Sequence, residues 1–295
     1  MNISIKPTVS FFLPQLALLF GLIAIFLVSV PGCASSDSES DGSPRSQSAV
    51  EYPIECSATI GMVAELVRNI GGEHVAVNQL IGSGVDPHLH KASRDDVQDI
   101  MAADMVFYCG LLLEGRMTDA LERGAKNKPV IAVTERIDES TLLSFEEFDG
   151  HFDPHVWNDV SAWSECAAVV AAELAKFDPE HASEFQENLA SYQAELGLLH
   201  DYGLQVISSI PEGSRVLITS HDAFNYFGRA YGLDVMGVQG LSTESEAGLQ
   251  RINELVDLII ENDVKAVFIE SSVSPKNIQA LIEGAKSRGH DVSIG

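Results

Sequence analysis

Basic residues are scarce in this sequence of 295 residues: 18 Lys and Arg stand against 43 Asp and Glu, for a formal net charge of −25. Because a protein needs a surplus of Lys and Arg to neutralise phosphates, this balance excludes nucleic acid as a partner. The hydrophobic fraction of 45% is ordinary for a globular protein. The length allows one large domain or two smaller ones, each with its own core.

Cysteine is also sparse, and its spacing argues against a disulfide framework. The four cysteines, at positions 33, 56, 109 and 166, are far apart and form no C-x-x-C pair. Cys109 lies in the apolar run MVFYC and Cys166 in a helical stretch, so both are predicted to be small buried core residues.

The N-terminus has the pattern of an export signal. A nearly uncharged apolar run over residues 8–30 follows a single Lys6 and ends in Pro-Gly-Cys-Ala-Ser-Ser. The run is long enough to span a bilayer, so an uncleaved anchor helix is the alternative. The letters VPGC resemble the bacterial lipobox, which predicts a signal peptide over residues 1–32 and a lipidated Cys33 as the first mature residue.

Residues 33–51 are rich in Ser, Asp, Gly and Pro and almost devoid of large apolar side chains. Such a segment cannot bury a core, so a flexible tether is predicted. A tether between a lipid anchor and a folded region predicts an extracytoplasmic protein held at a membrane.

From Tyr52 onward, short β-rich runs alternate with helical stretches, which indicates an α/β fold with mainly parallel sheets. Candidate strands are residues 54–59, 74–80, 105–109, 129–133, 215–220, 233–238, 266–270 and 291–295. Candidate helices are residues 60–71, 94–102, 114–124, 245–262 and 276–288.

The middle of the chain breaks this alternation. Residues 159–210 contain two helical stretches separated by Phe177-Asp178-Pro179 and no convincing strand. The pattern predicts an N-terminal lobe (52–178), a long connecting helix (179–210) and a C-terminal lobe (211–295). The alternative is one domain with a long surface helix.

Three of the nine histidines stand in contexts that suit metal ligands. His88 and His155 each end an Asp-Pro-His tripeptide, and proline stiffens the backbone that leads into each imidazole. The aspartate two residues upstream can bind nearby backbone or orient the imidazole. His221 follows a predicted strand, at the edge where open α/β sheets bind ligands.

Other histidines compete less well. His90 is a rival ligand because it lies two residues from His88, and His151 could be a peripheral one. The remaining histidines lie in strand or helix surroundings and are interpreted as hydrogen-bonded or exposed: His74, His181, His200 and His290. Three imidazoles suit Zn²⁺, and an added carboxylate leaves Mn²⁺ equally open.

Five segments together resemble the metal-binding receptors of bacterial zinc and manganese ABC importers: residues 84–115, 153–159, 219–233, 242–255 and 267–290. The resemblance covers nearly all of residues 52–295. It implies two α/β lobes joined by a long rigid helix, with Zn²⁺ or Mn²⁺ held between them by His88, His155 and His221. It also implies an ABC permease and its ATPase as partners, attachment to the membrane through the lipid, and a monomer.

Two departures from the family pattern bear on the site. The family's fourth ligand is an Asp after the last strand, and no position before Gly295 matches it, so a C-terminal truncation is expected. Glu270 belongs to a family motif and is expected to approach the site without being a direct ligand. Zinc-specific members often carry a His-rich loop, whereas residues 138–150 contain acids and no histidine.

Two other functions compete with metal capture and delivery. A zinc ion on three histidines with a bound water is a hydrolase or hydratase arrangement, but the sequence shows no H-E-x-x-H and no nucleophile elbow. An adhesin is the third possibility, and no motif supports it. The sequence therefore predicts a binding protein and not an enzyme.

Overall fold

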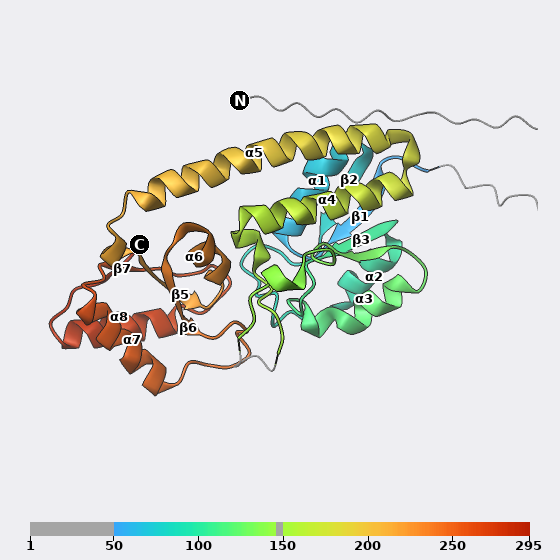
Figure 1. The fold of residues 1–295 in the computed structure, drawn as a ribbon. Coiled ribbons are helices and arrows are strands. Elements are labelled where there is room, and N and C mark those ends of the chain that lie inside the picture. The colour runs from blue at the N-terminus through green and yellow to red at the C-terminus, as the bar shows by residue number, and fades with distance from the viewer. Residues whose placement is uncertain (1–49, 146–149) are drawn as a thin grey trace, which may run out of the picture. The chain divides into compact units, whose positions relative to one another are not determined.

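The computed structural model describes residues 50–145 and 150–295 (Figure 1). The chain from Ala49 to Gly295 forms one compact unit. The predicted signal peptide (1–32), the lipidated Cys33 and most of the predicted tether lie outside the described residues.

The N-terminal lobe is built on a four-stranded parallel sheet with the order β2-β1-β3-β4. Its strands are β1 (Ile54–Ala58), β2 (Val75–Gln79), β3 (Met105–Tyr108) and β4 (Val130–Ala132). Its helices are α1 (Gly61–Gly71), α2 (Arg94–Ala102), α3 (Thr118–Ala125) and α4 (Val160–Phe177), with short 3₁₀ turns η1 (Gly72–His74), η2 (Gly115–Met117), η3 (Glu139–Thr141) and η5 (Val156–Asn158).

Burial explains why strands of this lobe are nearly continuous apolar runs in the sequence. A parallel sheet is covered on both faces, so β3 carries Met105, Val106 and Phe107 fully buried in succession. Helix α1 packs on α4 and α5, and α2 packs on α3. Cys109 and Cys166 are buried free thiols in this core, as predicted from their apolar surroundings.

A sharp break separates α4 from the longest helix. Helix α4 ends at Phe177, η6 (Pro179–His181) forms one 3₁₀ turn, and α5 (Ala182–Ser208) follows. Proline disfavours helical backbone at the preceding residue, and Asp178 leaves the helical region accordingly. With 27 residues, α5 is roughly 40 Å long, and it contacts α1 and α4 at one end and α6 at the other (Figure 1).

The C-terminal lobe has two smaller parallel pairs, β5-β6 and β7-β8, linked by a bridge between Thr219 and Phe268. Its strands are β5 (Val216–His221), β6 (Asp234–Gln239), β7 (Ala266–Val267) and β8 (Ser293–Ile294), and η7 (Glu212–Ser214) precedes them. Its helices are α6 (Asn225–Tyr231), α7 (Leu249–Glu261) and α8 (Lys276–Ser287). The predicted α/β class with parallel sheets and a long helix is confirmed.

Some predicted boundaries are wrong. The strand predicted over 266–270 ends at Val267, because the chain turns away to make a single bridge at Phe268. The helix predicted from 245 begins only at Leu249, since Gly248 is extended. None of the helices in the described ranges has the length and apolar character that crossing a bilayer requires.

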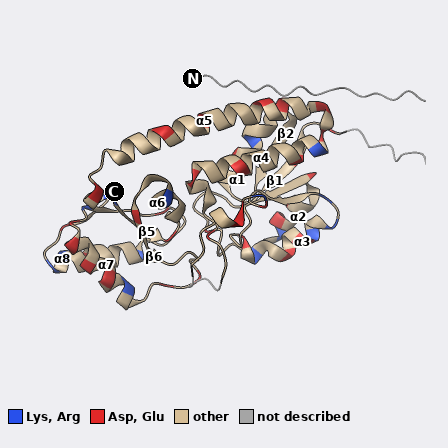
Figure 2. Cartoon of the chain, in the orientation of Figure 1, with Lys and Arg blue, Asp and Glu red and all other residues tan. Residues whose placement is uncertain are grey.

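Charge is spread over the helices of both lobes. Figure 2 shows acidic residues along α5, α7 and α8, with fewer basic residues among them. A surface of this kind attracts cations weakly and over a long range. It does not define a site, which depends on the buried groups described next.

Candidate metal centre

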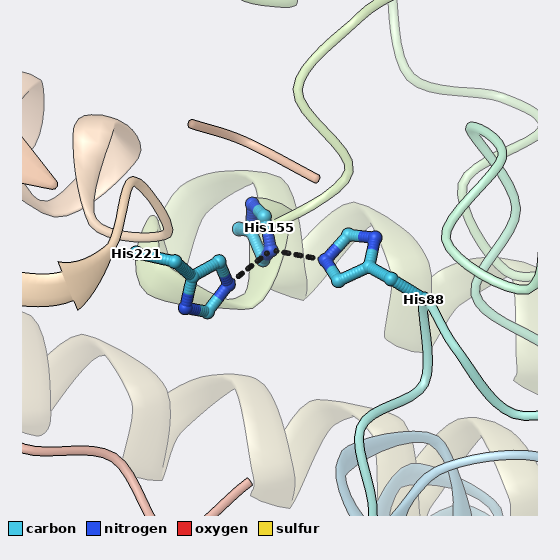
Figure 3. A group of neighbouring side chains, drawn as sticks. All are labelled: His88, His155 and His221. Carbon is cyan, nitrogen blue, oxygen red and sulfur yellow. Dashed lines mark hydrogen bonds between the residues drawn. The ribbon is translucent and has the colours of Figure 1, made fainter. Parts of the chain in front are cut away.

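Three buried histidines from three separate segments converge on one point (Figure 3). His88 comes from the loop between β2 and α2, His155 immediately precedes η5, and His221 is the last residue of β5. The Nε2 atom of His155 lies 3.2 Å from Nε2 of His88 and 3.3 Å from Nε2 of His221. The structure thus brings together all three histidines that were predicted as ligands.

The two Asp-Pro-His tripeptides form the same local turn. In each, the aspartate Oδ1 accepts a hydrogen bond of 2.9 Å from the backbone N–H of the histidine two residues later. Asp153 Oδ1 also lies 2.7 Å from Nδ1 of His155, whereas Oδ2 of Asp86 accepts from the hydroxyl of Thr243. The aspartate of the second tripeptide therefore orients its imidazole, and that of the first orients only the backbone.

Glu270 holds the third histidine. Its Oε1 accepts a hydrogen bond of 3.0 Å from the backbone N–H of His221. Its Oε2 lies 2.6 Å from Nδ1 of the same residue, a close contact without the alignment of a hydrogen bond. A carboxylate behind an imidazole fixes the ring and leaves Nε2 directed at the centre, which is the arrangement found around metal-bound histidines.

Burial favours the uncharged form of the His88 imidazole. Burial, together with repulsion from His155 and His221, lowers the pKa of His88 from 6.5 to about 3. His88 is therefore neutral at pH 7, and a neutral imidazole is the form that binds a metal. Two nitrogens on one tetrahedral Zn²⁺, at about 2.05 Å each, are roughly 3.3 Å apart, which matches the observed separations.

The histidines border a cavity of about 560 Å³ between the lobes. Gly61 and Gln79 line it from the N-terminal lobe and Glu270 from the C-terminal lobe. Trp157 stands edge-on to His155, with 5.2 Å between the ring centres. A small ion reaching the three nitrogens would lose most of its water and exchange it for imidazoles.

The rival histidines lie elsewhere. His90 Nε2 is 3.0 Å from Oδ2 of Asp96, which closes the capping box of α2 with Ser93. His151 is exposed and borders a neighbouring cavity together with His88. Reasoning from the sequence missed the contacts of Thr243 and Asn225 with the two aspartates, because neither residue is near them in the chain.

Comparison with known proteins extends over this whole arrangement. Residues 57–293 match the family described as "Zinc-uptake complex component A periplasmic". The manganese-binding lipoprotein MntA of Bacillus subtilis (strain 168) is 44% identical over 275 residues, which are 93% of this chain and 88% of the relative. The zinc-binding protein TroA of Treponema pallidum (strain Nichols) is 41% identical over 261 residues, 88% of this chain and 81% of the relative.

Solved structures share the fold. The periplasmic zinc-binding protein TroA of Treponema pallidum superposes with a TM-score of 0.80 at 42% identity, covering 83% of this chain and 87% of that one. Fe(III)-bound YtgA of Chlamydia trachomatis gives a TM-score of 0.74 at 26% identity, covering 82% and 87%. The predicted resemblance to receptors of metal ABC importers is thus confirmed: the chain belongs to the family of periplasmic zinc-uptake components, the substrate-binding proteins of metal importers.

Proposed function

We propose that this chain captures Zn²⁺ or Mn²⁺ between its two lobes through His88, His155 and His221 and delivers it to an ABC permease. The observation that carries the proposal is the convergence of three buried Nε2 atoms at separations of 3.2 and 3.3 Å. Buried nitrogens need donors or acceptors, and the three Nε2 atoms have one another as their nearest polar neighbours. A bound cation satisfies all of them at once.

The donor set supports both metals. Imidazole nitrogen suits Zn²⁺, and Mn²⁺ prefers more oxygen. Glu270 brings a carboxylate oxygen to 2.6 Å from Nδ1 of His221, behind the ring. The named activities of the relatives divide in the same way, since MntA is called manganese-binding and TroA zinc-binding.

The site supports binding rather than catalysis. The carboxylates of Asp153 and Glu270 are both engaged by imidazole nitrogens, and neither is free to take a proton from a metal-bound water. A general base must lie within hydrogen-bond reach of the proton it removes. We therefore propose a transport component with no enzymatic activity of its own.

We further propose that the protein acts outside the cytoplasm as a monomeric lipoprotein. In this proposal residues 1–32 are removed, Cys33 carries the lipid, and residues 33–51 tether the folded region to the membrane. The names of MntA and of the Streptococcus parasanguinis relative FimA as lipoproteins support it. Metabolic labelling with a radioactive fatty acid should mark the wild-type chain and leave Cys33→Ala unlabelled.

Isothermal titration of the full chain, purified in detergent, with Zn²⁺ and Mn²⁺ tests the metal proposal. His88→Ala should lower affinity for the preferred metal at least tenfold, since it removes one of three donors. His90→Ala is the matched control, because His90 lies on the same loop and its imidazole pairs with Asp96 at the start of α2. Equal affinity in wild type and His88→Ala would disprove the proposal.

A further inference from the structure

A second group of metal-binding side chains lies where the sequence shows no motif. His74, His181 and Glu184, here called the α5 cluster, each offer one donor atom, and the three atoms lie within 4.8 Å of one another. His74 ends η1 just before β2, His181 ends η6, and Glu184 is in the first turn of α5. Residues more than a hundred positions apart therefore meet at one place.

The side chains of the α5 cluster are already in contact. Nε2 of His74 lies 2.9 Å from Oε2 of Glu184. The imidazoles of His74 and His181 are stacked, with 3.9 Å between the ring centres and 25° between the planes. Both rings are partly exposed, and the Glu184 side chain is 53% exposed, so an ion in solvent can reach them.

A buried carboxylate orients one of these imidazoles. Asp178, which is 1% exposed, accepts a hydrogen bond of 2.8 Å from the hydroxyl of Tyr52. Its Oδ2 also lies 2.8 Å from Nδ1 of His181. This pairing engages Nδ1 and leaves Nε2 of His181 as the nitrogen that can bind an ion, in the same way that Asp153 acts on His155.

We propose that His74, His181 and Glu184 bind a second transition-metal ion, Zn²⁺ above all, with water completing its coordination. Two imidazoles and one carboxylate with an open position form a ligand set that Zn²⁺ takes readily. Donor atoms around such an ion lie roughly 3.3 Å apart. The exposed Glu184 and a tilt of the stacked rings supply the small movement that is needed.

The α5 cluster is separate from the three-histidine centre. Tyr52 and His74 precede β1 and β2, so the cluster lies at the amino ends of the parallel strands. His88 lies beyond the carboxyl end of β2. Five residues of strand span about 16 Å, which prevents the two sites from sharing an ion. An ion in the cluster would join the start of α5 to the edge of the sheet, and this inference does not depend on the transport function.

The test uses the full chain in detergent with the first site removed by His88→Ala and His155→Ala together. Titration of this double variant with Zn²⁺ should show that it still binds one Zn²⁺ ion per chain. Adding Glu184→Gln should weaken that binding at least tenfold, by loss of a charged ligand. Glu187→Gln is the matched control, an exposed acid on the same helix one turn further on, and should leave the binding unchanged.

His74→Gln serves as a second variant and should weaken the same equivalent to a similar degree. Co²⁺ in place of Zn²⁺ should give the intense visible absorption of tetrahedral coordination in the background, and Glu184→Gln should abolish it. A background that binds no Zn²⁺ would overturn the proposal. So would binding that is equally strong with Glu184→Gln and with Glu187→Gln. Thermal melting of each variant without metal shows that the comparison is between folded chains.

Discussion

The three-histidine centre and the α5 cluster place imidazoles and carboxylates together in opposite ways. At the centre, three buried imidazoles face one another and the carboxylates of Asp153 and Glu270 stand behind them. In the α5 cluster, Glu184 lies among the donors and the rings are partly exposed. At the centre the three Nε2 atoms are buried and directed at a common point. In the α5 cluster the side chains already make polar contacts with one another.

The position of each group in the sheet accounts for the difference. The centre lies beyond the carboxyl end of β2 and at the end of β5, where the three histidines are buried beside the cavity between the lobes. The α5 cluster lies at the amino ends of β1 and β2, where its two imidazoles and Glu184 stay partly exposed. We therefore expect the centre to bind its ion more tightly and more slowly than the α5 cluster.

The largest effect should come from His155→Ala. Its Nε2 is the atom that lies near both other histidines, so its removal leaves two nitrogens that no longer share a neighbour. We expect affinity at the centre to fall at least about 100-fold, measured by isothermal titration. His74→Ala is the comparison variant and should leave the tight equivalent intact. If His74→Ala lowered it as much, the two sites would not be independent.

Replacing a carboxylate behind one of the imidazoles should lower the metal affinity less than removing an imidazole does. Asp153→Asn keeps the shape of the side chain but removes the charge that orients His155, and we expect affinity to fall roughly 10–100-fold. Asp138→Asn is a matched control, since Asp138 caps the exposed turn η3 by accepting from the backbone of Ser140. Unchanged affinity in Asp153→Asn would mean that the tripeptide backbone alone positions His155.

Acid should destabilise the metal-free chain through the centre. Burial lowers the pKa of His88 to about 3 in the folded chain, against 6.5 in the unfolded chain. Below pH 6.5 the unfolded chain therefore binds a proton at His88 that the folded chain does not bind. Its contribution to stability is complete above pH 6.5 and is lost as the pH falls, at no more than about 1.4 kcal/mol per pH unit. Denaturant unfolding from pH 7.5 to 4.5 should show this slope, and His88→Asn should reduce it. Parallel curves for the two chains would contradict the assignment.

The smallest expected effect is a change in tryptophan fluorescence, which distinguishes metal binding at the centre from metal binding at the α5 cluster. Trp157 stands against His155, while Trp163, the other of the two tryptophans, is buried on α4. Metal at the centre should change the fluorescence of Trp157, and metal at the α5 cluster should not. Trp157→Phe should remove the change without preventing binding. A response that persists in Trp157→Phe would place its origin elsewhere.

Much of the fold followed from local patterns. β-rich runs of five to seven residues predicted β1 to β6 within a residue or two, because strands such as β3 that are buried on both faces have a nearly continuous apolar composition. Phe177-Asp178-Pro179 predicted the break before α5, since proline restricts the residue before it. The predicted end of β7 and the predicted start of α7 were wrong because sheet edges and loop geometry there depend on tertiary pairing.

The candidate sites divide along the same line. The repeated Asp-Pro-His tripeptide identified His88 and His155, because a stiff turn around an imidazole is a local feature that the sequence displays. Glu270 was expected near the site. The sequence did not show that Glu270 binds His221, because the two residues are 49 positions apart. His74 and His181 share no motif at all, and their stacking became apparent only in the folded chain.

The sequence by itself determined the acidic surface, the alternation of strands and helices, the break before α5 and the two stiff turns that carry His88 and His155. Each of these depends on composition or on a few consecutive residues, where steric restriction and burial act locally. The tertiary structure decided which of the nine histidines meet, which carboxylate stands behind each ring and which rings stay in solvent. Those outcomes depend on distances between segments far apart in the chain, which are set by the packing of both lobes against α5 and by direct contacts between the lobes, such as that of Thr243 with Asp86.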